Sequence, residues 1–461
     1  MDELQKIFKK HSSKTLFTFP NNQTMTYKDV FNKSIILSKS ILRKKKNIKN
    51  KIIFLKITRS VDYFIAILAF YILQTTIIPI STKISNSELH YLRKKYKPFL
   101  EIDDIKSYDT NINNKTIEIK NIFPKKSKLI FFTSGTTGKP KGIVHNFHNL
   151  IQSAKDFSDL AKYKKNNFVL HNWPHYYMAG FFNMFLCPII SGCKIFFDEE
   201  IGIETYLNYW QRLKSKKIDI AYLSPTMSNA LISYSNYKKI DNKKLNTKII
   251  STGAFLYETT KSKFKKTFGI DLINCYGVTE VGGSISLTNR KNSPNSIGKL
   301  SKGVKIKLSK KNEMLIKSKY LFEGYLESSS IFKKFTKDYF NSGDLAKLKN
   351  REFKITGRTK EIIKKGGEAV SLIKIEDVAL GCNGVKDVIA KGVPSEFWGE
   401  DIELDVIFSK SKTDKFGISK VDFLKKYLVQ NLSRLEIPRK IEIVKNIPKT
   451  AIGKNYRQSF I

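Results

Sequence analysis

Short apolar segments alternate with helical ones along much of this chain, and that alternation restricts the possible folds more than any other feature. Four segments have the length and the apolar content of buried strands: residues 51–57 (KIIFLKI), 193–197 (CKIFF), 218–224 (IDIAYLS) and 247–253 (TKIISTG). Helical segments such as residues 203–216 (IETYLNYWQRLKSK) lie between them. We therefore predict the α/β class, with layers of helices against mainly parallel sheets.

The pattern changes after about residue 300, where short strands follow one another at the spacing of hairpins: residues 304–309 (VKIKLS), 313–318 (EMLIKS) and 352–357 (EFKITG). From Lys360 onward, the order helix, strand, strand, helix, strand extends over about 100 residues, which is enough for a separate domain. We predict a large N-terminal domain over residues 1–359, built of layered α/β subdomains and a small barrel-like β region. A small α+β C-terminal domain is predicted over residues 360–461.

The chain is strongly basic, because 83 Lys and Arg residues face 41 Asp and Glu residues and leave a net charge of +42. Taken alone, such a charge balance indicates a nucleic-acid partner or an anionic membrane surface. The lysines here are spread along the whole chain, and Ile and Asn, whose codons are as AT-rich as those of Lys, are also abundant. We interpret the charge as codon bias that produces a solvated lysine coat, and we expect no nucleic-acid partner. The alternative, a basic nucleic-acid-binding protein, predicts clustered arginines and exposed aromatic residues.

Residues 63–80 (YFIAILAFYILQTTIIPI) carry no charge and reach the lower length limit of a membrane-spanning helix. Gln74 and Pro79 lie in the second half, however, and a buried helix of about 12 residues followed by a strand at 76–80 explains the same letters. We therefore do not expect an integral membrane protein, and the N-terminal residues lack the apolar core of a signal peptide. The cysteines are far apart without a Cys-x-x-Cys pair, which favours the reducing cytoplasm: Cys187, Cys193, Cys275 and Cys382.

A polar, glycine-rich loop follows a predicted strand at residues 128–133 (KLIFFT). The string from 130 to 144, IFFTSGTTGKPKGIV, combines glycines, Ser and Thr hydroxyls and two lysines, Lys139 and Lys141. Glycines allow backbone amides to turn inward, so such a loop can form a nest for a polyphosphate. The spacing is not that of a Walker A loop, because Pro140 follows the first lysine.

The string FTSGTTGKPKG resembles the phosphate-loop signature of the adenylate-forming (AMP-binding) superfamily, which contains acyl- and aryl-CoA synthetases, peptide-synthetase adenylation domains and luciferases. Further signatures of this superfamily follow in the expected order: STGAFL at 251–256, NCYGVTE at 274–280, NSGDLA at 341–346, GRTKEIIKKGGEAVSLIKIED at 357–377 and IPKTAIGKNYR at 447–457. MTYKDV at 25–30 extends the resemblance towards the N-terminus.

The resemblance implies an ATP-dependent acid–thiol ligase. A carboxylic acid and ATP would give an acyl-adenylate and pyrophosphate, and the acyl group would then pass to CoA, as in an acyl-CoA synthetase. ATP, Mg²⁺ and CoA are therefore expected beside the acid. A stand-alone enzyme that loads the phosphopantetheine of an acyl carrier protein is the alternative, and the sequence contains no recognisable carrier or condensation module. A pseudoenzyme scaffold is disfavoured by the intact Glu280 and Lys454.

The same resemblance implies a set of ATP-binding residues, which are distributed over these signatures: Thr133, Ser134, Gly135, Thr136, Thr137, Gly138, Lys141, Gly253, Ala254, Tyr276, Gly277, Asp344 and Arg358. The loop hydroxyls and the Lys141 ammonium would hold the β- and γ-phosphates. The backbone at Gly253 and Ala254 would border the adenine.

Five of the implied roles need particular chemistry. Tyr276 would stack on the adenine, and Asp344 would accept both ribose hydroxyls with help from Arg358. Thr279 would donate a hydrogen bond to the α-phosphate. Glu280 would hold Mg²⁺, a hard cation that prefers a carboxylate together with phosphate oxygens.

The C-terminal signatures imply that one active site serves two half-reactions by movement of the small domain. Lys454 would bridge the carboxylate and the α-phosphate, so it is implied to be catalytic together with Thr279 and Glu280. The small domain would rotate about Lys360 as the hinge. Gly366 and Gly367 would then leave a narrow path for the thiol arm.

The acyl pocket is the place where the sequence departs from the superfamily pattern. Tyr177 stands where the usual Pro-x-x-His signature has its histidine, which leaves the class of acid open. His171 and His175 are spaced like zinc ligands, but Pro174 breaks any helix between them, so we exclude a zinc site. The expected pocket is apolar and is lined by Trp173, Tyr176, Tyr177, Met178, Val278 and Gly282.

Overall fold

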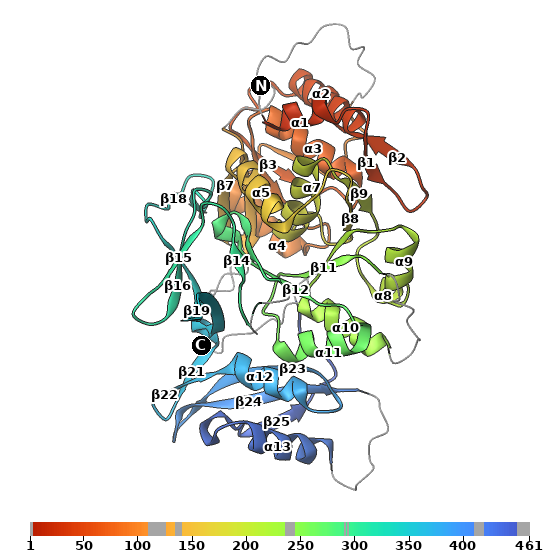
Figure 1. Cartoon of the computed structure of the whole chain (residues 1–461). Coiled ribbons are helices and arrows are strands. Elements are labelled where there is room, and N and C mark those ends of the chain that lie inside the picture. The colour runs from red at the N-terminus through yellow and green to blue at the C-terminus, as the bar shows by residue number, and fades with distance from the viewer. Residues whose placement is uncertain are drawn as a thin grey trace.

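The computed structural model describes residues 3–108, 126–133, 141–235, 245–289, 292, 295–409 and 419–449. Among these residues the strands form four sheets, which we name the N-terminal, central, small and C-terminal sheets. Figure 1 shows the N-terminal and central sheets with their helices towards one end of the molecule, and the C-terminal sheet, in blue, at the opposite end. The small sheet lies between these two ends, at one side.

The N-terminal sheet has the strand order β18-β17-β7-β6-β4-β3-β5. Its strands are β3 (Ile52–Leu55), β4 (Thr76–Pro79), β5 (Leu100–Ile102), β6 (Lys128–Thr133), β7 (Lys141–Asn146), β17 (Gly324–Leu326) and β18 (Phe332–Lys334). β3 pairs in parallel with β4 and β5, whereas β6 and β7 form an antiparallel hairpin. The predicted helix and strand within residues 63–80 are confirmed as α3 (Val61–Ile72) and β4, and burial of α3 from Tyr63 onward explains its lack of charge.

The central sheet has the order β14-β13-β12-β11-β10-β8-β9-β1-β2. Its strands are β1 (Thr15–Thr18), β2 (Thr24–Thr26), β8 (Phe168–His171), β9 (Lys194–Phe197), β10 (Ile220–Leu223), β11 (Lys248–Ser251), β12 (Ile273–Val278), β13 (Gly283–Leu287) and β14 (Lys299–Leu300). The pairs from β1 through β9, β8, β10 and β11 to β12 are parallel, as the alternation predicted. Their carboxyl ends therefore share one edge, which is where ligands bind in open α/β sheets.

The helical segment predicted at residues 203–216 is confirmed. The segment forms two helices, α8 (Ile203–Leu207) and α9 (Tyr209–Ser215), and the break at Asn208 has φ −107° and ψ 7°. Asparagine disfavours helix interiors because its side chain competes for backbone hydrogen bonds. The other helices of these two layers are α1 (Glu3–Lys10), α2 (Tyr27–Lys44), α4 (Asn86–Tyr96), α5 (Phe147–Ala161), α6 (Met178–Phe181), α7 (Cys187–Ser191), α10 (Pro225–Ser235) and α11 (Glu258–Phe268). No helix in the described ranges has the length and hydropathy needed to cross a bilayer.

The small sheet confirms the β region predicted after residue 300. It is antiparallel throughout, with the order β15-β16-β19-β20, and consists of β15 (Lys305–Leu308), β16 (Glu313–Lys317), β19 (Phe340–Lys349) and β20 (Glu352–Arg358). Its buried face contains Met314, Ile316 and Ala346. This face packs against Tyr276, which lies on β12 of the central sheet, and against Val281, which lies just after β12. This packing places the β19–β20 hairpin beside the end of β12.

The C-terminal sheet has the order β22-β21-β24-β23, with β25 beside β24. Its elements are β21 (Ile362–Lys365), β22 (Glu368–Ser371), α12 (Leu372–Gly381), β23 (Val385–Ser395), β24 (Gly399–Phe408), α13 (Lys420–Asn431) and β25 (Lys440–Ile443). The predicted order helix, strand, strand, helix, strand matches α12 to β25, whereas the preceding β21–β22 hairpin was not predicted. These elements share their own apolar core, including Ile375, Leu404 and Leu428. The domain boundary at Lys360 stays a prediction.

Three of the six histidines are buried on or beside the strands of these sheets. His145 lies on β7, His171 ends β8, and His175 lies in the turn after β8. Burial lowers the pKa of His145 to about 4 and that of His175 to about 4. Burial, with the neighbouring Arg59, holds the pKa of His171 well below its ordinary value. The folded protein therefore keeps these imidazoles neutral at pH 7.

We predict that the protein loses stability as the pH falls from about 6.5 towards 4. An unfolded histidine has a pKa near 6.5 and binds a proton in this window, whereas the buried residue does not, so protons favour unfolding. Each histidine contributes up to about 1.4 kcal/mol per pH unit. Urea unfolding at pH 7.5, 6.5 and 5.5 measures the loss of unfolding free energy. The His145→Gln variant should bind about one proton fewer on unfolding, so its unfolding free energy should depend less steeply on pH. An unfolding free energy that is constant across these pH values would contradict the buried neutral state.

Candidate active site

The candidate site forms where the end of β12, the turn η2 (Thr279–Val281), the β19–β20 hairpin and the start of β7 meet. β12 carries Tyr276 and runs directly into η2, which carries Thr279 and Glu280. The register of β19 and β20 sets Asp344 opposite Arg358. Signatures that are far apart in the sequence are therefore brought together by two neighbouring sheets.

Asp344 is buried, and both of its carboxylate oxygens accept hydrogen bonds. Tyr276 donates its hydroxyl to Oδ2 at 2.5 Å, and Arg358 donates Nε to Oδ1 at 2.5 Å. Burial and the adjacent carboxylate raise the pKa of Tyr276 well above its ordinary value. Burial lowers the pKa of Arg358, but Asp344 and Glu361 outweigh this effect and leave it raised. The Asp344 carboxylate is therefore held in place by two donors, and its remaining lone pairs can accept further donors, such as ribose hydroxyls.

Glu280 is a largely buried carboxylate beside a tyrosine. Burial raises its pKa, while the Tyr325 hydroxyl, which lies 3.4 Å from Oε1, and the charges of Arg358 and Lys141 oppose the shift. Tyr325 belongs to β17, which pairs with β7, and Lys141 Nζ lies 5.8 Å from the centre of its ring. Sequence reasoning missed Tyr325, because it lies outside every signature and reaches Glu280 only through the β7–β17 pairing.

The cations around these carboxylates form a positive cluster. Partial burial lowers the pKa of Lys360, and the charges of Lys141 and Arg358 lower it further. Within the described residues, no group of three or more His, Cys, Asp or Glu side chains could hold a metal ion. The Glu280 carboxylate is a hard oxygen donor of the kind that Mg²⁺ prefers.

The phosphate loop connects β6 and β7, whose last register pair is Thr133 opposite Lys141. The loop therefore starts and ends at neighbouring positions of the N-terminal sheet. Its last flanking residue, Lys141, is near enough to Glu280 for its charge to act on that carboxylate. Ser134, Gly135, Thr136, Thr137 and Gly138 lie outside the described residues, as does the side chain of Thr133.

The residues predicted on the adenine side lie on β12 and just after β11. A side chain at Gly277 would collide with the carbonyl of Gly283, and Gly253 has φ +90°, which favours glycine. Ala254 lines a small space of about 60 Å³ between α10 and the C-terminal elements, together with Asn229, Glu361 and Asp387 among others. The predicted adenine border therefore faces residues of both the large and the C-terminal parts.

The predicted acyl-pocket residues lie in two places. Tyr176, Tyr177 and Met178 follow Trp173 in the turn after β8, while Val278 and Gly282 flank η2. Trp173 is fully buried and donates its indole N–H to the Tyr222 carbonyl at 3.0 Å, so it anchors the turn to β10. Only part of each tyrosine remains exposed, and their rings are 6.3 Å apart.

Gly366 and Gly367 form the turn of the β21–β22 hairpin, with φ +61° and +84°. A side chain on Gly366 would approach the Trp398 ring to 2.9 Å, whereas no atom of the described residues lies within 4 Å of a Cβ at Gly367. Lys454 lies outside the described residues. The last described lysine, Lys449, pairs with Asp387 at 2.5 Å beside the Ala254 space.

Polar contacts between α11 and α12 hold the C-terminal elements against the central layer. The Tyr257 hydroxyl donates to Glu376, the Thr259 amide donates to Asp377 at 3.2 Å, and Lys263 Nζ donates to the carbonyl of Leu380. These three contacts, which we call the α11–α12 latch, fix the orientation in which the structure presents the two parts.

Comparisons with known proteins identify the family of the chain. The profile of AMP-binding enzymes matches residues 4–326, and that of the AMP-binding enzyme C-terminal domain matches residues 374–454. The chain is 26% identical over 370 residues to malonate–CoA ligase ACSF3, mitochondrial, of Mus musculus. This match covers 71% of this chain and 62% of the relative. It is 27% identical over 361 residues to 2-succinylbenzoate–CoA ligase of Staphylococcus aureus, which covers 76% of this chain and 69% of the relative.

Solved structures share the fold at low sequence identity. The anthranilate CoA ligase AuaEII in complex with anthranoyl-AMP superposes with a TM-score of 0.85 at 18% identity, over 99% of this chain and 95% of that one. The O-succinylbenzoate coenzyme A synthetase of Bacillus subtilis, in complex with ATP and magnesium ion, gives a TM-score of 0.83 at 18% identity, over 98% of both chains. The first profile alone spans more than half of the chain, and this protein therefore belongs to the family of AMP-binding enzymes.

Proposed function

We propose that this protein is an AMP-forming acid–CoA ligase. It would join a carboxylic acid to ATP with release of pyrophosphate, and then pass the acyl group from the adenylate to the thiol of CoA. One observation carries the proposal: Glu280, Lys141 and the Tyr276–Asp344–Arg358 cluster converge from separate segments. Relatives named as CoA ligases support the choice of acceptor.

The positive cluster meets the main electrostatic demand of adenylation. A carboxylate must approach a triphosphate, so like charges have to be neutralised where the transition state forms. Lys141, Arg358 and Lys360 supply cations on one side. Lys454 would supply another from the C-terminal part: Lys449 is anchored beside the Ala254 space, and five further residues extend at most about 17 Å.

Asp344 and Glu280 would have two separate roles, binding of the ribose and binding of Mg²⁺. Asp344, held by Tyr276 and Arg358, would accept the ribose hydroxyls and thereby orient the α-phosphate. Glu280 would hold Mg²⁺, which when bound polarises the phosphoryl oxygens. The raised pKa of Glu280 reflects burial without a bound cation, so a nearby cation would stabilise its charged form.

The second half-reaction would use the β21–β22 turn. The open space around Gly367 supports a thiol path there, and Lys360 would be the hinge of the movement. Rotation of the C-terminal part requires the α11–α12 latch to open. Its contacts are polar, so water can replace each hydrogen bond at modest cost.

The residues predicted to line the acyl pocket suggest the character of the acid. Tyr176, Tyr177 and Met178 offer apolar surface with two phenol hydroxyls, which would accept an acid that has both apolar and polar parts. A carrier-protein phosphopantetheine remains the alternative acceptor. We place the enzyme in the cytoplasm, because ATP and CoA are available there and the four cysteines are free thiols.

A panel of carboxylic acids with ATP and Mg²⁺ tests the proposed function. Acid-dependent pyrophosphate release, followed by acyl-CoA formation after addition of CoA, is the expected result. Transfer to a phosphopantetheinylated carrier protein but not to CoA would replace the acceptor. Pyrophosphate release with none of the acids would contradict the proposal.

We predict that Glu280→Gln lowers acid-dependent ATP–pyrophosphate exchange by about 10²-fold or more, because it removes the charge that would hold Mg²⁺. Folding should persist, since Gln keeps the size of the side chain. Glu323→Gln is the matched control: this carboxylate is near the start of β17 and pairs with Lys128 at 2.9 Å, outside the site. Equal exchange rates in the Glu280→Gln variant and the wild type would refute the metal assignment.

A second pair of variants should separate the half-reactions. Lys454→Ala should lose adenylate formation, yet it should still transfer the acyl group from synthetic acyl-adenylate to CoA. Gly367→Leu should do the reverse, because a bulky side chain would fill the open space at the turn. Both rates are measurable by chromatography of acyl-AMP and acyl-CoA.

The control for Gly367→Leu is Gly384→Leu. Gly384 has φ +89° and lies between α12 and β23, so the substitution brings the same backbone strain to the C-terminal part away from the turn. It should leave both half-reactions intact. Loss of the same half-reaction in Lys454→Ala and Gly367→Leu would rule out domain alternation in this protein.

A further inference from the structure

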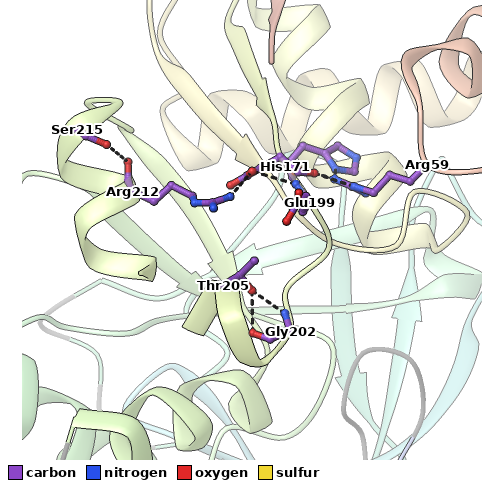
Figure 2. Close-up of polar contacts among 8 residues, drawn as sticks. Arg59, His171, Glu199, Gly202, Thr205, Arg212 and Ser215 are labelled. Atoms are coloured by element: carbon purple, nitrogen blue, oxygen red, sulfur yellow. Dashed lines mark hydrogen bonds and ion pairs between the residues drawn. The ribbon is translucent and has the colours of Figure 1, made fainter. Parts of the chain in front are cut away.

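Arg59 makes an unusual set of contacts for an arginine. It follows β3, and its guanidinium donates Nε to the Asp198 carbonyl, one terminal nitrogen to the Trp173 carbonyl and the other to the His171 carbonyl, each at 2.7 Å. The carbon between these nitrogens lies 4.3 Å from the centre of the Phe197 ring. Burial lowers its pKa to about 10, so it remains cationic at neutral pH. Figure 2 shows Arg59 pointing towards His171, with Arg212 approaching from the opposite side.

These contacts join two sheets at their carboxyl ends. Arg59 belongs to the loop after β3 of the N-terminal sheet, whereas His171 and Phe197 end β8 and β9 of the central sheet. Arginine can hold several carbonyls at once because its donors are arranged in a rigid planar fork. A single side chain therefore sets the spacing between the loop after β3 and the ends of β8 and β9.

The same loop and the start of α3, which follows it, hold the turn after β8 at further points. The Ile57 carbonyl lies 3.0 Å from Nε2 of His175, and the ring of Tyr63 packs edge-on against the His175 ring at 4.3 Å. The anchored Trp173 carbonyl is followed by Pro174, whose own carbonyl accepts the amide of Tyr177 at 3.2 Å. Arg59 thus fixes the start of the turn that bears Tyr176, Tyr177 and Met178.

Arg59 is unsuited to bind the substrate directly. Its hydrogen bonds go to protein carbonyls and, at 3.3 Å, to Nδ1 of His171. The nearby Asp198 carboxylate is also engaged, since Oδ1 accepts the Glu199 amide at 3.0 Å and forms an ion pair with Arg212. The contacts therefore serve the backbone of the turn.

We propose that Arg59 is a positioning residue for the acid-binding site, which it shapes by clamping the carbonyls of His171 and Trp173. This inference rests on the proposed function for the identity of the ligand. The position of the clamped turn does not depend on that function, and the two can be tested separately.

The test compares Arg59→Gln, Arg59→Lys and Arg212→Gln. Arg59→Gln should raise the KM for the acid by about tenfold or more and change the KM for ATP less than about twofold, since displaced pocket residues weaken productive binding. Arg59→Lys should lie between this variant and the wild type, because one ammonium cannot reach all three carbonyls. Arg212→Gln removes a cation from the same Asp198 without touching either clamped carbonyl, so it should leave the KM for the acid unchanged.

Hydrogen exchange provides a readout that does not need activity. In Arg59→Gln, or in Arg59→Lys should the first variant fail to fold, amides of residues 173–181 should exchange faster than in the wild type. Amides of β10 and β11 should keep their rates. An unchanged exchange pattern, faster exchange across the whole central sheet, or equal increases in both KM values would overturn the proposal. A wild type that adenylates no acid would refute the proposed function alone, and the exchange result would still decide the role of Arg59.

Discussion

The buried carboxylate of Asp344 is the contact on which the candidate site depends. A buried anion is stable only when charge and hydrogen bonds compensate it, and here Arg358 supplies the charge while Tyr276 supplies a second donor. Because Tyr276 comes from the central sheet and the other two from the small sheet, this compensation sets how the two sheets meet. The positions of Glu280, four residues after Tyr276, and of Lys360, two residues after Arg358, follow from it.

At the edges of the N-terminal and central sheets, single polar side chains likewise join segments that are separate in the sequence. Arg59 links three backbone carbonyls from two strand ends, and Tyr325 reaches Glu280 from a strand that pairs with β7. In both cases one side chain joins segments that local structure leaves independent. The site is therefore built from a few cross-sheet contacts, and its geometry is as precise as those contacts are rigid.

Much of the fold could be predicted because strands buried on both faces have to be continuously apolar. Residues 51–57, 218–224 and 247–253 show this pattern, and each contains a parallel strand. Sequence reasoning failed where tertiary contacts decide the outcome: nothing near Arg59 or Tyr325 in the sequence indicates their partners. The signatures predicted which segments matter, while the pairing of β7 with β17 and of β19 with β20 determines which side chains meet.

The neutral histidines have a consequence for how the lysine coat acts at a distance. Since His145, His171 and His175 stay uncharged in the fold, the net charge of +42 hardly changes across the pH range of a living cell. Ionic strength then becomes the variable that controls the long-range pull on anionic nucleotides. At about 0.15 M salt the field decays over about 8 Å, so only ligands already near the surface are guided. In dilute buffer the same field would speed the binding of nucleotides and slow the release of pyrophosphate. As salt is removed, the rate-limiting step of turnover would therefore shift from nucleotide binding to product release.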